Sequence, residues 1–185
     1  MNHKGTQIIK TQRLMLRPFT SDDAPAMFCN WANDPRVTRF LTWQPHGTLE
    51  VTQGIIDGWC ALYANPAYYH WGIEFEGRLI GGISVVRQSD YDEVAELGYC
   101  IGADFWGRGI TAEAAKAVIN YLFFEVGVHR VEIHHATDNP ASGRVAEKCG
   151  LTCEGVLRSR SKTGTGEFKD IRVWGILREE WKTED

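Results

Sequence analysis

Residues 102–117 read GADFWGRGITAEAAKA, and they constrain the fold more than any other stretch of the chain. Two glycines enclose Arg108, a strand-like pattern at 94–101 precedes them, and an alanine-rich helical pattern follows. Glycines let a ligand approach the backbone closely, and the N-terminus of a helix adds the positive end of its dipole. The stretch therefore predicts a strand, a turn and a helix that together bind an anion.

Two known phosphate-binding patterns match this stretch only in part. A P-loop needs lysine and then serine or threonine after its second glycine, but Arg108 and Gly109 follow Gly107, so the magnesium ligand is missing. The dinucleotide pattern G-x-G-x-x-G/A is matched by Gly107, Gly109 and Ala112. Antiparallel hairpins precede it, however, and in that fold the first glycine follows its strand directly. We reject the P-loop and keep an NAD(P)-dependent reductase as the weakest alternative.

The remaining sequence alternates strand and helix patterns without a repeat or a linker. We expect strands at 14–17, 71–75, 79–87, 94–101, 130–136, 152–160 and 168–177, and helices at 22–31, 48–63, 110–126 and 140–149. Hairpins with inserted helices indicate an α+β, or mixed α/β, fold. The length of 185 residues favours a single domain covering 1–185.

Charge and composition exclude several classes of partner. The net charge of −4 and the absence of a lysine and arginine stripe argue against direct nucleic-acid binding. No apolar run of membrane length and no signal peptide is present, so we expect a cytoplasmic protein without a membrane partner. The five cysteines form no C-x-x-C pair, and the adjacent His134 and His135 point to opposite faces of a strand. We therefore expect no metal and a structural role for both histidines.

The glycine stretch resembles the acetyl-CoA motif of the GNAT superfamily of N-acetyltransferases, Gln/Arg-x-x-Gly-x-Gly/Ala. Trp106 stands at the position of its first residue, and Thr111 stands at the position of its last. The resemblance implies that acetyl-CoA binds, as a co-substrate, to Trp106, Gly107, Arg108, Gly109, Ile110 and Thr111.

Three further segments resemble, in order, the ribosomal-protein-alanine N-acetyltransferase branch: TQRLMLRPFTSDDA, AELGYCIG and NPASGRVAEKCGLTCEG. The branch implies a GNAT-like fold, which is a largely antiparallel twisted sheet of six to seven strands with a splayed central pair, flanked by about four helices. The pantetheine arm would pair with the backbone of Tyr99, Cys100 and Ile101, and the last segment would add Asn139 and Lys148.

The implied reaction is direct attack of a primary amine on the thioester, which needs a base and a donor for the leaving thiolate. Many superfamily members carry a tyrosine seven residues after the motif asparagine, where this chain has Ala146. Ser142 matches the serine of the ribosomal branch and is the candidate donor, beside water. Glu96 is the candidate base, with Glu154 or water as alternatives. Asn139 and Ser142 also fit the first turn of a helix as capping and polar residues.

The branch implies that the acceptor is the N-terminal α-amino group of a ribosomal protein. A small-molecule amine or an antibiotic is an alternative acceptor. A catalytically silent CoA-binding protein is an alternative of another class, because the tyrosine is missing. We expect a monomer or a homodimer. Core packing accounts for most aromatic residues of the first half, and some of them are expected to wall the acceptor site: Trp31, Phe40, Trp43, Trp59, Tyr63, Tyr68, Tyr69 and Trp71.

Overall fold

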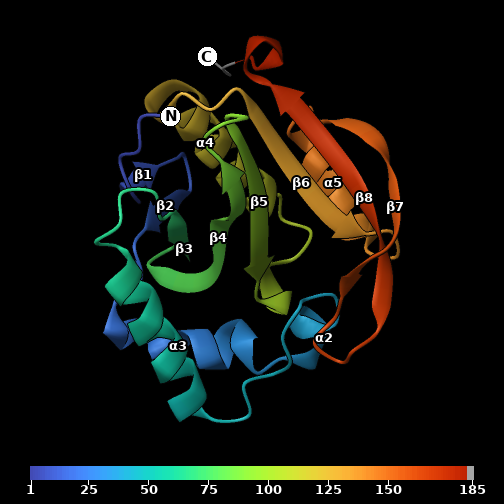
Figure 1. Ribbon diagram of the computed structural model, residues 1–185. Helices are drawn as coiled ribbons and strands as arrows, with labels where there is room; N and C mark the ends of the chain where they lie inside the picture. The colour runs from blue at the N-terminus through green and yellow to red at the C-terminus, as the bar shows by residue number, and fades with distance from the viewer. Residues whose placement is uncertain (183–185) are drawn as a thin grey trace.

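The computed structural model describes residues 1–182 (Figure 1). One eight-stranded sheet runs through it in the order β1-β2-β3-β4-β5-β6-β8-β7. Its neighbouring strands pair antiparallel except for β5 and β6, which are parallel. The strands are β1 (Ile9–Lys10), β2 (Leu14–Arg17), β3 (His70–Phe75), β4 (Arg78–Ser89), β5 (Val94–Ile101), β6 (Arg130–Ala136), β7 (Thr152–Lys162) and β8 (Phe168–Leu177).

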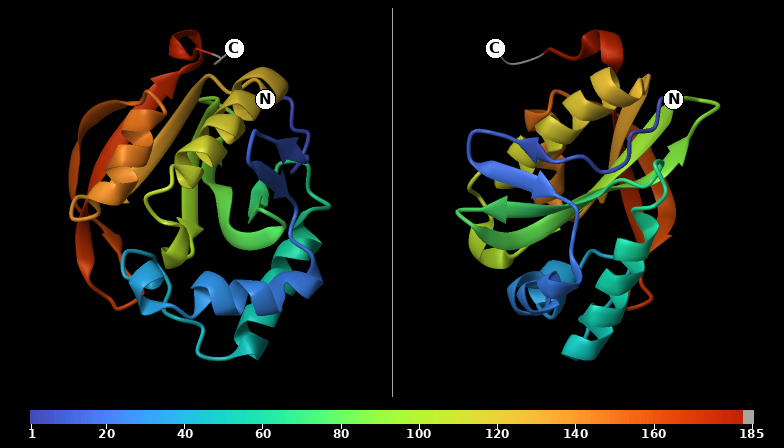
Figure 2. Two further views of the ribbon diagram at one scale, coloured as in Figure 1. Left: turned by 180° about the vertical axis from the view of Figure 1, so that it is seen from behind. Right: turned by 90° about the vertical axis from the view of Figure 1, so that its left-hand side faces the viewer.

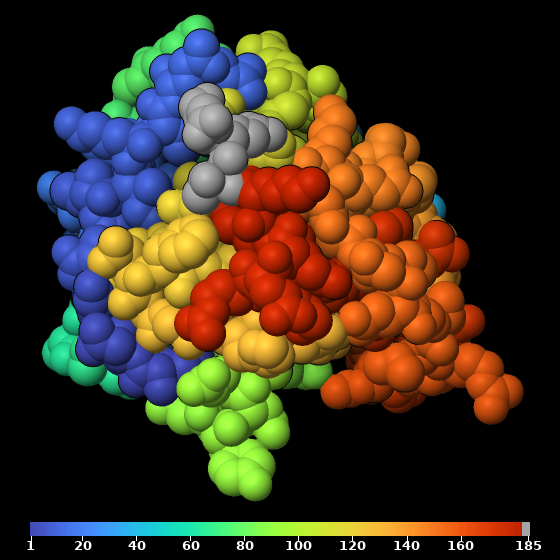
Figure 3. All heavy atoms as spheres, turned by 90° about the horizontal axis from the view of Figure 1, so that it is seen from above, coloured from blue at the N-terminus to red at the C-terminus, as the bar shows by residue number. Residues whose placement is uncertain are grey.

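The helices form two groups. In Figure 2, α4 and α5 cover one face of the sheet, whereas α1 to α3 lie together at the end of the sheet that is lowest in Figure 1. The turn between β4 and β5 projects from the body (Figure 3, green). The α-helices are α1 (Ala24–Met27), α2 (Pro35–Thr38), α3 (Leu49–Leu62), α4 (Ile110–Tyr121) and α5 (Pro140–Lys148).

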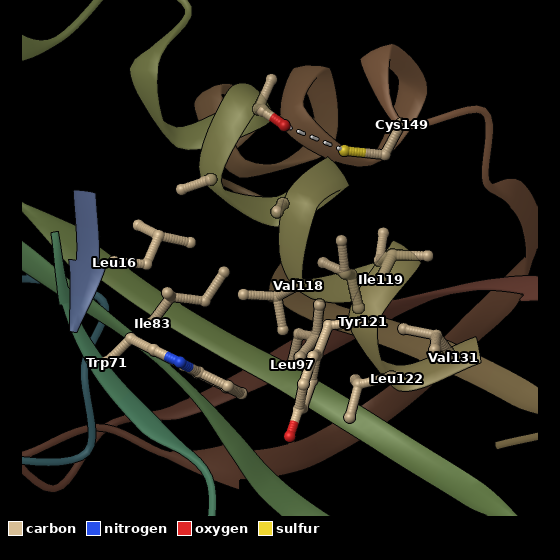
Figure 4. Close-up of a cluster of buried hydrophobic side chains, with 14 of the residues drawn as sticks. Leu16, Trp71, Ile83, Leu97, Val118, Ile119, Tyr121, Leu122, Val131 and Cys149 are labelled. Carbon is tan, nitrogen blue, oxygen red and sulfur yellow. Dashed lines mark hydrogen bonds between the residues drawn. The ribbon is translucent and has the colours of Figure 1, made fainter. Parts of the chain in front are cut away.

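Apolar residues at helical spacing fix α4 on the sheet. Val118, Ile119 and Leu122 are fully buried against strand residues such as Leu97 and Val131 (Figure 4). Each such side chain contributes about 1.5–3 kcal/mol by leaving water. After α4 the helix continues as a π-helical turn, Leu122–Val126, and ends at Gly127, which has a left-handed conformation. The sequence predicted that this glycine ends the helix.

The central parallel pair separates along its length. β5 and β6 pair from Val94↔Arg130 to Leu97↔Ile133 and no further. β5 then continues on β4 alone, and β6 continues on β8 as far as Ala136. Figure 1 shows the two strands diverging toward α2. A bulge in β4, which adds local twist, lies where the separation begins. The predicted splayed pair is confirmed, and with it the fold class.

Three details differ from the sequence prediction. The sheet has eight strands rather than six to seven, because the two-residue β1 is too short to show an alternating pattern. The helix expected at 22–31 is a succession of 3-10, α and π turns from Ser21 to Ala32. The short α2 follows the cap of Asp34, whose carboxylate accepts from the N–H of Arg36 at 2.9 Å. Within residues 1–182, no helix is long and apolar enough to span a membrane.

Candidate active site

The turn before α4 has the backbone that its glycines predict. Gly107 and Gly109 have φ angles of 76° and 75°, in the left-handed region that favours glycine, and Gly109 is the N-cap of α4. A Cβ atom at Gly107 would meet nothing within 4 Å, and one at Gly109 would meet only Arg13 Nη2 at 3.8 Å. The space beside both glycines is open, so an anion has room to approach the N-terminus of α4.

A charged pair that the sequence did not point to braces this turn. Glu113, in the first turn of α4, accepts from Arg13 Nε at 2.7 Å and from Thr11 Oγ1 at 2.6 Å. Arg13 Nη1 also donates to the carbonyl of Arg108 at 3.2 Å. Although burial opposes it, these hydrogen bonds hold the pKa of Glu113 below its usual range. Arg13 therefore balances the negative charge that Glu113 places beside a predicted anion site.

The other predicted ligands in this stretch take different places. The indole N–H of Trp106 donates to the carbonyl of Ile101 at 3.0 Å and ties the turn to the end of β5. The guanidinium of Arg108 lies 5.5 Å from the ring centroid of Phe105. Ile110 is buried in the core, so only its backbone is available to a ligand, while Thr111 is half-buried.

The free end of β5 presents two kinds of side chain. Ile101 packs into the core under α4, and Tyr99 points toward α5. Cys100 faces the other side, as strand alternation requires. Burial raises the pKa of the Cys100 thiol to about 12, so this thiol stays protonated near neutral pH. The backbone of Tyr99, Cys100 and Ile101 makes no ladder pairs with β6, because the β5–β6 pairing ends at Leu97.

The start of α5 lies across the gap from β5. Asn139 caps the helix by accepting from the N–H of Ser142 at 3.4 Å, so its capping role is observed. The Ser142 Oγ atom lies 2.9 Å from the Tyr99 hydroxyl. Lys148 is at the opposite end of α5, where it lines a groove of about 1130 Å³ together with Gly109. The structure thus brings Ser142 to β5 and Lys148 beside the start of α4.

A cleft of about 790 Å³ opens on the sheet face opposite α4. Gly98, Tyr99 and Cys100 of β5 line it, as do His134, His135 and Ala136 of β6. Tyr99 and His135 reach it because the two strands have separated there. Four of the eight aromatic residues named from the sequence also line it: Trp31, Phe40, Trp43 and Trp59. Tyr69 and Trp71 belong to the main core instead.

The β7–β8 turn closes the outer wall of this cleft. The N–H of Gly164 donates to the carbonyl of Leu41 at 2.9 Å, and Gln44 Nε2 donates to the carbonyl of Gly164 at 2.8 Å. A Cβ atom on Gly164 would lie 2.4 Å from the backbone carbon of Trp43. A side chain there would therefore push the wall outward.

His134 lies beside the cleft between the carboxylates of Glu96 and Glu132, an arrangement that the sequence did not predict. Glu96 lines the cleft, and its Oε2 lies 3.3 Å from His134 Nδ1. His134 Nε2 lies 2.9 Å from Glu132 Oε2, and Glu132 is also paired with Arg130 at 2.7 Å. Glu96 and Glu132 are register partners on β5 and β6, which no spacing within the sequence reveals. His134 therefore lies between the two carboxylates, and its buried Nε2 atom makes no hydrogen bond within the described residues.

Glu154 and His135, which the sequence analysis also named, are engaged by other groups of the protein. Glu154 is clamped by Arg130, whose hydrogen bonds lower the pKa of this carboxyl, and it does not line the cleft. His135 contacts the Ala136 carbonyl through Nδ1 at 2.7 Å and accepts from Trp174 Nε1 at 3.0 Å. A structural role fits both side chains.

His70 stands at the aromatic side of the cleft. Its ring lies 4.2 Å from Trp59 and 5.0 Å from Phe19, centroid to centroid. Its Nδ1 atom is 3.1 Å from the Tyr68 hydroxyl. Burial lowers the pKa of His70 to about 3, so it is neutral near pH 7. An uncharged polar group thus lines an otherwise aromatic wall.

Comparisons with known proteins identify the family of the chain. Residues 13–152 match the family model of the acetyltransferase (GNAT) domain. The chain is 36% identical over 173 residues to the uncharacterized N-acetyltransferase YoaA of Bacillus subtilis, covering 92% of this chain and 97% of YoaA. It is 35% identical over 102 residues to a ribosomal-protein-serine acetyltransferase of Escherichia coli, covering 55% and 56% of the two chains. The ribosomal protein acetyltransferase RimL, solved in complex with coenzyme A, superposes with a TM-score of 0.83 at 22% identity, covering 92% and 98%.

The chain therefore belongs to the GNAT family of acetyltransferases. Membership excludes the reductase alternative that the G-x-G-x-x-A match had left open. The protein is an acetyl-CoA-dependent N-acetyltransferase.

Proposed function

We propose that this enzyme acetylates the N-terminal α-amino group of a protein, with a ribosomal protein as the first candidate. The observation that carries the proposal is the cleft that meets the separated ends of β5 and β6 from the face opposite α4 and α5. A thioester entering from the helix side would meet an amine entering from the cleft at this gap.

On the helix side, the proposed acetyl-CoA site runs from the start of α4 to β5. The open turn at Gly107 and Gly109 would hold the pyrophosphate by backbone N–H groups and the helix dipole. The backbone of Tyr99, Cys100 and Ile101 would pair with the pantetheine arm, as a further strand would. The remaining proposed contacts are Trp106, Arg108, Ile110, Thr111, Asn139 and Lys148.

In the proposed reaction, the amine nitrogen attacks the thioester carbonyl carbon. A C–N bond forms, the C–S bond breaks, and the sulfur leaves as a thiolate. Glu96, which lies beside His134, takes the proton that the amine nitrogen loses. The hydroxyl of Ser142 donates a hydrogen bond to the thiolate, which is then protonated through water.

An α-amine suits this site better than a lysine side chain. Its pKa near 7.7–8.0 leaves a substantial neutral fraction near pH 7.5, whereas a lysine amine at about 10.4 is almost fully charged. A single carboxylate base is sufficient for the first and poor for the second. The names of the Escherichia coli relative and of RimL support a ribosomal protein as acceptor.

Thiol release from acetyl-CoA tests the activity and the acceptor together. We expect release with short peptides that carry a free α-amine, and little with the same peptides when the α-amine is blocked and only a lysine is free. Mass spectrometry of protein N-termini from cells with and without the enzyme then identifies the acceptor. Release only with small amines, and unchanged N-termini, would make the enzyme a small-molecule acetyltransferase. No release with any amine would favour a silent CoA-binding protein.

A further inference from the structure

Two hydroxyl groups meet where β5 and β6 have separated. Tyr99 comes from the free end of β5, and Ser142 comes from the first turn of α5. Their oxygens are 2.9 Å apart, and the Tyr99 hydroxyl is also 3.3 Å from the Ser142 carbonyl. No sequence pattern connects these residues, which are 43 positions apart.

The phenol of Tyr99 is the fixed member of this pair. Its ring packs against the core under α4 and α5, and burial raises the pKa of the hydroxyl above its usual range. Tyr99 therefore keeps its proton near neutral pH. One turn after Ser142, the same side of α5 carries the fully buried Ala146, which has no hydroxyl to offer.

The Ser142 hydroxyl has one hydrogen and two lone pairs. If that hydrogen points to Tyr99, it is not available to a leaving thiolate. If Tyr99 donates instead, the serine oxygen is the acceptor, and its own hydrogen turns away from the phenol. The Tyr99 hydrogen can also reach the Ser142 carbonyl at 3.3 Å, but the contact to Oγ is shorter, at 2.9 Å, so we take Oγ as its acceptor. A chain of two hydroxyls with the same donor direction also polarises the terminal O–H bond, which strengthens its last hydrogen bond.

We propose that Tyr99 is a positioning residue that donates to Ser142 Oγ and so directs the serine hydroxyl at the departing thiolate. This inference rests on the proposed role of Ser142. In the transition state the hydrogen-bond chain runs from the Tyr99 hydroxyl to the Ser142 oxygen, and from the Ser142 hydroxyl to the sulfur. No proton leaves Tyr99, and both residues are unchanged after the C–S bond has broken.

A double-mutant cycle with Tyr99→Phe and Ser142→Ala tests the proposal. Tyr99→Phe keeps the partly buried ring and removes only the hydroxyl, so we expect kcat to fall about three- to tenfold, the value of one hydrogen bond, with an unchanged KM for acetyl-CoA. Ser142→Ala should lower kcat by at least as much. In the Ser142→Ala background, Tyr99→Phe should have no further effect, because a residue that acts through the serine has nothing left to orient.

Tyr121→Phe is the matched control. Tyr121 packs in the same core, and its hydroxyl donates to the Gly5 carbonyl at 2.8 Å, away from the cleft. We expect it to lower the melting temperature as Tyr99→Phe does, while kcat stays at the wild-type value. A loss of kcat in Tyr121→Phe equal to that in Tyr99→Phe would mean that the Tyr99 effect is structural, which overturns the proposal.

The remaining outcomes separate this inference from the function on which it rests. Unchanged kcat in Tyr99→Phe, with a loss in Ser142→Ala, overturns the positioning role and leaves Ser142 as the donor. Losses that multiply in the double variant overturn it as well, because the two hydroxyls then act independently. A silent Ser142→Ala removes the proposed role of the serine itself, and any loss in Tyr99→Phe would then be a direct effect of the phenol.

Discussion

Gly109→Ala separates backbone strain from ligand binding at the turn before α4. The residue has a φ of 75°, and the nearest atom to an added Cβ, Arg13 Nη2, lies at 3.8 Å. Without the ligand, the methyl group therefore costs only the left-handed conformation, roughly 1–2 kcal/mol. For a chain of this size that is a fall in melting temperature of roughly 2–8 °C.

With acetyl-CoA the same methyl group has a second effect. It occupies open space beside the N-terminus of α4, where the pyrophosphate is proposed to lie. Each charge-assisted hydrogen bond from a backbone N–H contributes roughly 1.5–3 kcal/mol, and 1.4 kcal/mol is tenfold in affinity. If the phosphate is displaced from one such group, KM for acetyl-CoA should rise about ten- to a hundredfold. The kcat should change much less, since the reacting atoms are not touched.

Gly127→Ala provides the matched control. Gly127 has a φ of 84°, an added Cβ would meet nothing within 4 Å, and it ends the helical segment far along the chain from the turn. Thermal unfolding and steady-state kinetics on both variants give the two effects separately. We expect similar falls in melting temperature, but a raised KM only in Gly109→Ala. Equal KM values in the two folded variants would refute the pyrophosphate role of this turn.

Three further predictions concern the cleft. Glu96→Gln should lower kcat about a hundredfold without changing acetyl-CoA affinity, whereas Glu154→Gln should leave kcat near wild type; the reverse result in the same peptide assay would make Glu154 the base. Gly164→Ala should raise KM for the amine but not for acetyl-CoA, because its Cβ displaces the backbone of Trp43 by contact at 2.4 Å; an unchanged amine KM would show that this wall does not touch the acceptor. Burial holds the pKa of His70 at about 3 in the folded protein, whereas the unfolded chain protonates it near pH 6.5. The neutral folded state of His70 therefore contributes fully to the free energy of unfolding above pH 6.5, and this contribution is lost as the pH falls toward about 3. Urea unfolding at pH 7.5 and 5.5 should therefore show wild type losing about 1 kcal/mol more than His70→Gln, and equal losses would contradict the burial of His70.

Much of the fold followed from local patterns in the sequence. The apolar spacing of α4, the glycine that ends it and the hairpins on either side act within a few residues, so they can be read directly. The positive φ angles of Gly107 and Gly109 follow from the same local logic, since few other residues adopt them at low cost. The short β1 and α2 were missed because two to four residues do not show a period.

The candidate site also has one part that local sequence patterns predict and another that they do not. The sequence supplied its individual residues, including Glu96 and Ser142, through local motifs and family resemblance. Their partners lie on other strands and helices, and such pairings depend on register and packing rather than on spacing. His134 gained a place beside Glu96 only because β5 and β6 pair in one register before they separate.

The sequence by itself determined the local elements, the glycine turn before α4 and the family of this protein, because each of these depends on residues within short segments. The tertiary structure alone decided which groups face one another: Arg13 with Glu113, His134 with Glu96, and Tyr99 with Ser142. The physical reason is that hydrogen bonds and ion pairs act over about 3 Å, whereas the residues that form them are 38 to 100 positions apart.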